Sequence, residues 1–337
     1  MGEKSVNYLA VMAKEFLGID LGTTNTLIYS SKEDKILYHE PTCLALENKS
    51  GNVSRFGFLA DKIDGKAPYN LKMVHPVKNG LIDDDDACAV YLEKVLTSLH
   101  LTGRNRPATF VFTVPSSCSK VNRKAVIDIG RRLGAKEIYL ESQARLAALG
   151  ASKNAYVPSA TLLLQIGSGI SDIVCLSLGE IVAADSSPIA GSTFDEAIRR
   201  YLMQNQHLSI GAKSAEELKI RAADLTPVSE NRLSEIRGRD TLTSLPSSII
   251  VSSGELRNAL FPLANLIALK VSDVVSKIPP ELVVDLTRNG LYLSGGGALL
   301  TGLKSYLQNV LSLPVNLVEK PTETIGEGFR LYRRVLR

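Results

Sequence analysis

The chain has 337 residues, of which 45% are hydrophobic and 22% charged, and its formal net charge is only +4. This length exceeds what one ordinary core supports, so we expect a globular protein of two domains. Basic and acidic residues are interspersed along the chain, which argues against a nucleic-acid binder that relies on a basic stripe.

The cysteines and the apolar runs indicate in which cellular compartment the protein is expected. Cys43, Cys88, Cys118 and Cys175 are far apart and form no CxxC pair or Cys/His cluster, so neither a zinc site nor a disulfide framework is predicted. Reduced thiols fit the cytoplasm. We find no secretory pattern at the start and no apolar stretch of the roughly 18 to 20 residues that cross a bilayer. We therefore expect a cytoplasmic protein.

The first segment, residues 5–17, has apolar residues at helical spacing, with Lys14 and the preceding Lys4 available for the other side. It predicts a short amphipathic helix, which would lie on the inner face of the membrane. The alternative is an ordinary extension that packs on the domain or is partly disordered.

The first half of the remaining chain alternates strands and helices. Two β-rich runs flank a Gly/Thr/Asn turn at 22–25, which predicts a hairpin. Strands are then expected at 42–46, 109–114 and 138–140, and helices at 84–99, 119–133 (capped by Ser119 and ended by Gly134) and 143–151.

From Ala160 the pattern begins again. A strand, a Gly/Ser turn and a second strand cover 161–176, and a third strand covers 181–185. Helices are expected at 192–204 and 214–223, a strand at 290–294, and a helix at 299–311. The chain therefore consists of two α/β halves, each opened by a β-hairpin, and we expect them to pack around a shared cleft.

The two hairpin turns supply what a phosphate clamp needs. Gly22 and Gly167 let the backbone approach a ligand and take positive φ. Backbone and hydroxyl donors for phosphate come from Thr23, Thr24, Asn25, Ser168, Gly169 and Ser171. Asp20 ends its strand at the same place, where its carboxylate is suited to hold Mg²⁺ through water.

Two further elements are candidates for the rest of a nucleotide. The turn Gly295, Gly296, Gly297, Ala298 presents bare backbone to a ring or sugar, although a tight structural turn would look the same. In the helix from 214, Glu216, Glu217, Leu218 and Lys219 are candidates for contacts with ribose and adenine. The alternative is that Ser214 and Glu217 only form a capping box.

Together these four elements resemble the actin/Hsp70/sugar-kinase superfamily and, within it, the bacterial MreB family of actin homologues. The resemblance runs from Gly18 to about Arg334, and its most specific parts are residues 18–26, 191–198, 214–219, 279–282 and 293–300. It implies an α/β, actin-like fold of duplicated ribonuclease-H-like halves around a nucleotide cleft. An extension (1–17) would precede domain I (18–154) and domain II (155–337), whose C-terminal helix returns to domain I.

The resemblance also implies a function. Such proteins bind ATP with Mg²⁺, form double filaments, associate with the membrane and guide cell shape, or cell form and swimming in wall-less bacteria. We expect self-assembly into filaments, with other MreB paralogues as further partners and no nucleic acid. The runner-up is a non-polymerising ATP-binding partner of another filament. A chaperone would need a peptide-binding domain after residue 337, and a sugar kinase an acceptor base that we do not find.

The chain departs from the family at two carboxylates. The family's second phosphate strand ends in Asp, where this chain has Gln165, which we still count as cofactor-binding. The family's Glu-Glu-Pro is here Ser142-Gln143-Ala144, so Gln143 can position a water but cannot accept its proton. Ser168 and Ser192 also replace a glycine and an acidic residue. We expect a weak ATPase at most, the alternative being neutral drift in a site where chemistry never limited the rate.

Overall fold

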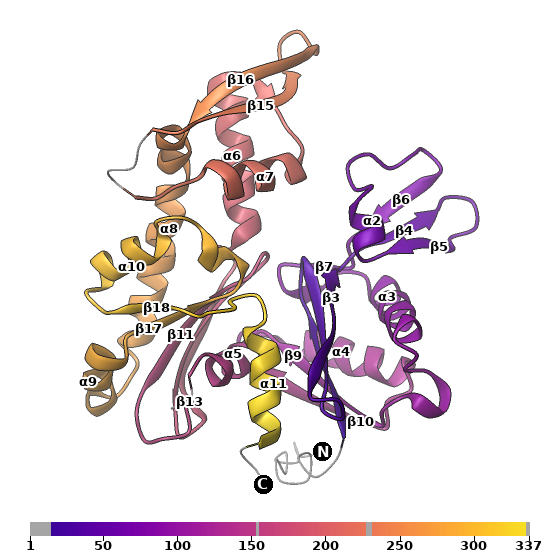
Figure 1. The fold of residues 1–337 in the computed structure, drawn as a ribbon, viewed down its shortest axis with the longest axis vertical. Helices are drawn as coiled ribbons and strands as arrows, with labels where there is room; N and C mark the ends of the chain where they lie inside the picture. The colour runs from indigo at the N-terminus through magenta and orange to yellow at the C-terminus, as the bar shows by residue number, and fades with distance from the viewer. Residues whose placement is uncertain (1–14, 153–154, 227–230, 335–337) are drawn as a thin grey trace. The chain divides into compact units, whose positions relative to one another are not determined.

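The structure of the protein is a computed structural model that describes residues 15–152, 155–226 and 231–334 (Figure 1). The chain divides into two compact units. Unit 1 comprises residues 1–153 and 323–337, and unit 2 comprises residues 154–322. The predicted domain II ran from 155 to 337 with its last helix returning to domain I. In the structure, residues 323 onward are counted with unit 1.

Unit 1 is built on a five-stranded mixed sheet in the order β10-β9-β1-β2-β3. Strands β1, β2 and β3 form an antiparallel meander, whereas β9 and β10 extend the sheet on the other side of β1 in parallel. The strands are β1 (Phe16–Leu21), β2 (Asn25–Ser30), β3 (Lys35–Pro41), β9 (Thr109–Val114) and β10 (Glu137–Ser142). All six residues of β9 are buried, as expected for an inner parallel strand covered on both faces.

Helices cover both faces of this sheet. On one face, α3 (Asp85–Ser98) and α4 (Lys120–Arg132) pack on the apolar side chains that alternate along the strands, such as Ile19, Phe112 and Leu140. On the other face, α5 (Gln143–Ala151) packs against α11 (Thr324–Arg334), which crosses β1, β2 and β3. The last helix is therefore an integral layer of unit 1.

Shorter elements complete unit 1 between β3 and β9. They are β4 (Leu44–Glu47), β5 (Val53–Phe56), α2 (Phe58–Asp61), β6 (Leu71–Val74), β7 (Val77–Lys78), β8 (Leu81–Ile82) and the 3-10 turn η1 (Gly103–Asn105). Strands β5, β4 and β6 form a small separate sheet, and β7 pairs with β8.

Unit 2 repeats the sheet of unit 1. Its order is β13-β12-β11-β17-β18, again with a three-strand antiparallel meander and two parallel strands beyond the first. The strands are β11 (Thr161–Ile166), β12 (Ser171–Ser177), β13 (Glu180–Ser187), β17 (Leu291–Ser294) and β18 (Val315–Leu317). The predicted duplication is thus present at the level of strand order and direction.

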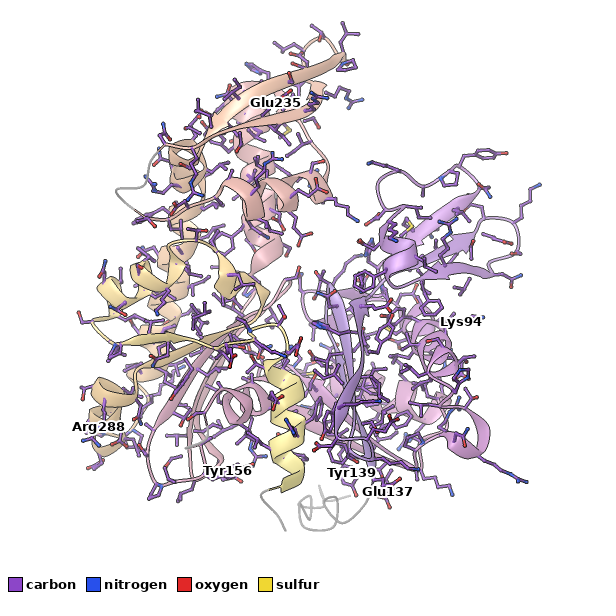
Figure 2. All side chains as sticks on the ribbon, viewed as in Figure 1. Lys94, Glu137, Tyr139, Tyr156, Glu235 and Arg288 are labelled. Atoms are coloured by element: carbon purple, nitrogen blue, oxygen red, sulfur yellow. The ribbon has the colours of Figure 1, made fainter. Side chains whose placement is uncertain are left out.

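The insertion between β13 and β17 differs from that of unit 1. It contains α6 (Gly191–Gln206), β14 (Leu208–Ser209), α7 (Ala212–Ala222), β15 (Leu233–Asp240), β16 (Pro246–Ser252), α8 (Ser253–Val275) and α9 (Pro280–Asn289). After β17 follow the 3-10 turn η2 (Gly296–Leu299) and α10 (Leu303–Leu311). Strands β14, β15 and β16 form a small sheet, and Glu235 stands on the exposed side of its middle strand (Figure 2).

Helix α8 has the length and apolar composition of a membrane span, unlike any other helix in the described ranges. The sequence prediction did not single it out. One face of α8 is buried in the core of unit 2 through Leu256, Leu260, Ile267 and Val271. On another face, the Lys270 ammonium lies 3.5 Å from the Asp185 carboxylate. These contacts are those of a core helix, and the composition alone is weak support for a span.

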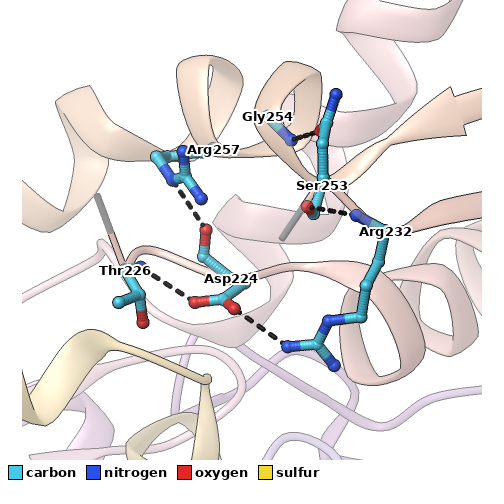
Figure 3. Close-up of polar contacts among 7 residues, drawn as sticks. Asp224, Thr226, Arg232, Ser253, Gly254 and Arg257 are labelled. Carbon is cyan, nitrogen blue, oxygen red and sulfur yellow. Dashed lines mark hydrogen bonds and ion pairs between the residues drawn. The ribbon is translucent and has the colours of Figure 1, made fainter. Parts of the chain in front are cut away.

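A buried carboxylate ties the chain after α7 to the start of α8 (Figure 3). The Asp224 carboxylate accepts a hydrogen bond from the Thr226 amide at 2.8 Å and one from the Arg232 guanidinium at 2.9 Å. The Arg257 side chain of α8 donates to the Asp224 carbonyl at 3.0 Å. Burial alone would raise the pKa of Asp224, but these hydrogen bonds outweigh it and lower that pKa.

Several expected elements differ from the observed ones. The helix expected at 5–17 falls largely outside the described residues, and Phe16 and Leu17 belong to β1 because they pair with β9 and β2. The strand expected at 42–46 is β4, and β3 before it was missed. The helix expected at 299–311 is interrupted, because Gly302 takes φ +80° and lies directly against Thr226.

Candidate functional site

The first predicted phosphate turn joins β1 to β2 in unit 1. The Gly22 amide donates to the Asn25 carbonyl at 3.1 Å, and the strands pair up to Leu21 and Thr26. A Cβ at Gly22 would lie 2.5 Å from that carbonyl oxygen, so only glycine fits. The expected positive φ is wrong for Gly22 and for Gly167, neither of which has it. At Gly22 the requirement is space beside the backbone. The Asn25 side chain is exposed.

Asp20 is held by the neighbouring strand of the same sheet. It is half-buried near the end of β1, and its carboxylate accepts a hydrogen bond from the Thr113 hydroxyl of β9. A carboxylate has about four acceptor positions, so it can also bind a hydrated cation. Within the described ranges no three His, Cys, Asp or Glu side chains gather to hold a metal directly. The predicted Mg²⁺, held by Asp20 through water, does not need such a cluster of protein ligands.

The two threonines of the turn are tied to the chain that follows β3. The Thr23 hydroxyl accepts a hydrogen bond from the Gly80 amide at 2.8 Å, and the Thr24 carbonyl accepts one from the Thr42 amide at 2.7 Å. Both threonines are half-buried. The turn is therefore braced from outside, and the Thr23 hydroxyl, which accepts from Gly80, can still donate its own proton.

Gln143 is the first residue of α5, directly after β10. Ser142 caps the helix, its hydroxyl accepting from the Arg145 amide at 3.3 Å. Gln143 is half-buried. The amide is thus presented at the carboxyl end of a parallel strand and at the start of a helix, where a water and a phosphate are well placed.

Sequence reasoning missed a carboxylate two residues before Gln143. Glu141 is 6% exposed and forms a buried ion pair with Arg145, with 2.9 Å between Oε2 and Nη1. Burial raises the pKa of Glu141, and Arg145, the Ser142 amide and the Tyr332 hydroxyl oppose that rise. Glu and Arg four residues apart across a strand-to-helix junction were a usable signal, because both lie in otherwise apolar surroundings.

The second predicted phosphate turn joins β11 to β12 in unit 2 and is anchored to α6. The Gly167 amide donates to the Ile170 carbonyl at 3.0 Å. The Gly191 amide donates to the Gly167 carbonyl at 3.0 Å, and the Ser192 amide donates to the Ser168 carbonyl at 2.8 Å. The first amides of α6 therefore hold the turn itself and are not available to an anion.

Two residues of this turn are less accessible than predicted. Ser171 is buried, and its hydroxyl donates to the Ile189 carbonyl at 2.6 Å, so it is not a phosphate donor. Gly169 is buried as well. Gly167 and Ser168 are half-buried and form the accessible part of the turn.

Gln165 carries an unsatisfied buried oxygen at the end of β11. The residue is 7% exposed, and its Oε1 has no hydrogen-bond partner. Its strand partners are Asp172 on β12 and Ser294 on β17. A buried amide oxygen without a donor costs about 1–3 kcal/mol, so this one fits a ligand that brings a donor, such as a water molecule on a bound cation.

Lys219 has a different role from the predicted one. Its ammonium lies 2.8 Å from the Asp195 carboxylate of α6 and donates to the Gly191 carbonyl at 3.2 Å. Both side chains are 13% exposed. Burial raises the pKa of Asp195, and Lys219 opposes the rise. Lys219 thus fastens α7 to the first turn of α6, next to the phosphate turn.

The other predicted residues of α7 differ in how deeply they are buried. Leu218 lies in the core of unit 2, so its side chain is not open to a ligand. Glu216 is half-buried and Glu217 exposed, which leaves two carboxylates suited to ribose hydroxyls. The predicted cap at Ser214 is wrong, because the helix begins at Ala212 with Gly211 as its N-cap.

The third element, at the end of β17, packs directly on the end of β11. A Cβ at Gly295 or Gly297 would lie 2.3 Å from an atom of Ile166, so these glycines are required by the protein's own packing. Gly296 is exposed, and the nearest atom to its Cβ position is 3.9 Å away. It therefore presents open backbone to a ligand, whereas Ala298 is buried.

Unit 2 therefore gathers three of the four predicted elements around the end of β11: the second turn, α7 and the glycine turn. Unit 1 supplies the first turn and Asp20 from the neighbouring strands β1 and β2, and Gln143 from the end of β10, which β9 separates from β1 in the same sheet. Unit 1 thus offers backbone donors in a tight turn and a carboxylate, and unit 2 offers backbone donors, an unsatisfied amide oxygen and two carboxylates. These are kinds of groups that can bind phosphates, sugars or hydrated cations.

Known proteins are similar to this chain in sequence and in fold. The family model described as MreB/Mbl protein matches residues 14–336. The cell shape-determining protein Mbl of Bacillus subtilis is 34% identical over 312 residues, 93% of each chain. The crystal structure of MreB5 of Spiroplasma citri bound to ADP is 31% identical, with a TM-score of 0.89 over 96% of this chain and 97% of that one; another MreB5 crystal structure holds AMPPNP.

A double helical filament of MamK is 21% identical with a TM-score of 0.78 over 95% of this chain and 98% of that one, a likeness in fold alone. The predicted actin-like α/β fold is confirmed by these structures.

Proposed function

This chain belongs to the MreB/Mbl family of bacterial cell-shape proteins, which are cytoskeletal actin homologues, and on that premise we propose that it binds ATP and polymerises into actin-like filaments. The filaments would organise cell shape, or form and motility in a cell without a wall. We place the protein in the cytoplasm, at the inner face of the membrane, with self-association as its main interaction and other members of the family as further partners.

The observation that carries the nucleotide proposal is the anchored phosphate turn of unit 2. Its carbonyls are held by the amides of Gly191 and Ser192, and its neighbour Lys219 is bound to Asp195. The exposed Gly296 lies in the turn after β17, the strand that pairs with β11. Such bracing fixes backbone donors before a ligand arrives, which lowers the cost of binding. The MreB5 structures with AMPPNP and ADP support the same assignment.

We assign Mg²⁺ to Asp20, which would accept hydrogen bonds from the ion's water shell. In unit 2, the buried Oε1 of Gln165 is a cofactor-binding acceptor that would gain from a bound water the donor that it lacks. When bound, the ion neutralises charge on the terminal phosphates. The chain's own part is to orient the water molecules around it.

We further propose that hydrolysis is slow. Gln143 can orient an attacking water but cannot take its proton, and Gln165 is a neutral amide where the family has a carboxylate. A missing acid or base typically costs on the order of 10²- to 10⁴-fold in rate. Bound ATP would then act as a structural ligand or a slow timer.

Sedimentation of purified protein across concentrations, with ATP, with ADP and without nucleotide, tests assembly. A pellet above a threshold concentration would support the filament proposal, and its nucleotide dependence would show whether ATP gates assembly. No pellet under any condition would favour the runner-up, a non-polymerising partner, and a related filament protein would then be added to the assay.

The hydrolysis proposal has its own test. Phosphate release should accelerate in the double variant Gln143→Glu, Gln165→Asp, because both carboxylates are restored. The matched control is Asn122→Asp, a neutral-to-acid change in α4 of the same unit as Gln143. A wild-type release rate that the double variant does not exceed would refute slow turnover through these two positions.

A further inference from the structure

We propose that the last helix, α11, holds the junction between β10 and α5 and thereby positions Gln143, with Tyr332, Glu141 and Arg145 as the positioning residues. This inference rests on the proposed function, because Gln143 has a task only when a nucleotide is bound.

The three side chains form one buried polar contact on the sheet face that carries α5 and α11. Glu141 binds the Arg145 guanidinium with Oε2 at 2.9 Å and accepts from the Ser142 amide with Oε1 at 2.8 Å. The Tyr332 hydroxyl also hydrogen-bonds to Glu141. Glu141, Arg145 and Tyr332 are 6%, 7% and 3% exposed. One carboxylate therefore joins the end of β10, the first turn of α5 and the C-terminal part of α11.

The two helices touch through backbone at two glycines. A Cβ at Gly150 of α5 would lie 2.1 Å from the Thr324 carbonyl, and a Cβ at Gly328 of α11 would lie 2.0 Å from the Leu146 carbonyl. Contacts this close leave no room for one helix to shift against the other. Any displacement of α11 is therefore passed to α5 and to its first residues.

A purely structural role explains this arrangement poorly. Buried ion pairs stabilise little compared with apolar side chains of the same volume, because both charges lose water. What the ion pair does add is a fixed orientation, since Oε1 is bound to Ser142, directly before Gln143, and Oε2 to Arg145, two residues after it. Catalytic geometry is sensitive to shifts of about 1 Å, so a fixed junction matters to a residue that orients a water molecule.

Tyr332→Phe removes only the hydroxyl, and Tyr139→Phe is its matched control. Tyr139 lies on β10 beside Glu137, with its hydroxyl 3.4 Å from the Glu137 carboxylate (Figure 2). Amide hydrogen exchange of the full chain should rise roughly ten-fold for residues 142–146 in Tyr332→Phe, through loss of one hydrogen bond to a charged group. Tyr139→Phe should leave these amides unchanged.

Phosphate release and nucleotide affinity complete the test. Tyr332→Phe should slow single-turnover phosphate release several-fold and leave the affinity for a fluorescent ADP analogue within about two-fold, because the phosphate turns are not touched. Unchanged exchange at 142–146, or an equal rise throughout unit 1, would overturn the proposal. If wild-type protein bound no nucleotide, the proposed function would fail, and the exchange result would still decide whether α11 fixes the junction.

Discussion

Gly328→Ala should destabilise unit 1 strongly, because the new methyl group would meet backbone. The Cβ position lies 2.0 Å from the Leu146 carbonyl oxygen, whereas ordinary contact begins at about 3.4 Å. Overpacking costs roughly 1–3 kcal/mol when side chains can move aside. Here a helix backbone must move, so we expect about 3 kcal/mol. The better helix propensity of alanine returns about 1 kcal/mol.

The net loss of about 2 kcal/mol corresponds to a fall in Tm of roughly 4–8 °C for a domain of this size. Gly326→Ala, on the same helix, is the control. Its Cβ would meet the Ile36 Cδ1 at 2.7 Å, the movable end of a side chain, so its stability should stay within about 1 kcal/mol of wild type. Thermal and urea unfolding of both variants measure the difference. Equal stability of Gly328→Ala and wild type would show that the α5–α11 contact is not as close as described.

Three further predictions concern other parts of the chain. Asp224→Asn should lower the free energy of unfolding at pH 7 and flatten the decline of that free energy in acid. The folded-state pKa of Asp224 lies below the usual 3.8, so its contribution to stability is complete above about pH 4 and is lost as the pH falls through the folded-state pKa. Urea unfolding from pH 2.5 to 7 would show how steeply stability depends on pH. Lys219→Met should leave the Asp195 carboxylate buried without its cation, which should cost about 3 kcal/mol of stability and weaken nucleotide binding. Thermal shift with and without ADP measures both effects, and an unchanged Tm would contradict the prediction. Maleimide should label Cys118 first, since Cys118 is half-buried at a surface pocket. Burial raises the pKa of Cys88 and Cys175 to about 12, so these thiols should react more slowly. Mass spectrometry of labelled native protein would show whether Cys88 or Cys175 is labelled before Cys118.

Much of the fold was predictable because hairpins, caps and apolar runs are local signals. Asp84 and Ser119 cap α3 and α4 as side-chain acceptors, and the buried runs of β9 and β11 read as inner strands. The prediction failed where residues far away in the sequence determine the local structure. Gly302 interrupts the helix expected at 299–311 and is the N-cap of α10, with Thr226 lying against it. The missed β3 is a local failure, because β3 pairs with β2 across a short turn.

The candidate site was predictable in its residue types but not in their roles. Lys219 and Ser171 are polar residues of suitable chemistry, yet the structure uses one for an ion pair with Asp195 and the other for a hydrogen bond to Ile189. Gly22, Gly295 and Gly297 are glycines because the protein's own atoms fill the space beside them. Such competition between ligand and neighbour is settled by tertiary contacts, which no spacing in the sequence displays.

The position of α11 has a consequence for synthesis on the ribosome. All of unit 2 is translated before α11, although α11 covers the aromatic group of Phe16 and Tyr29 near the start of the chain, with Phe329 stacked 6.0 Å from Tyr29. Unit 2 is continuous in sequence and can fold as it emerges. Until the last helix is released, unit 1 has one sheet face covered only in part, by α5, so nascent chains should depend on a chaperone chiefly through their first half.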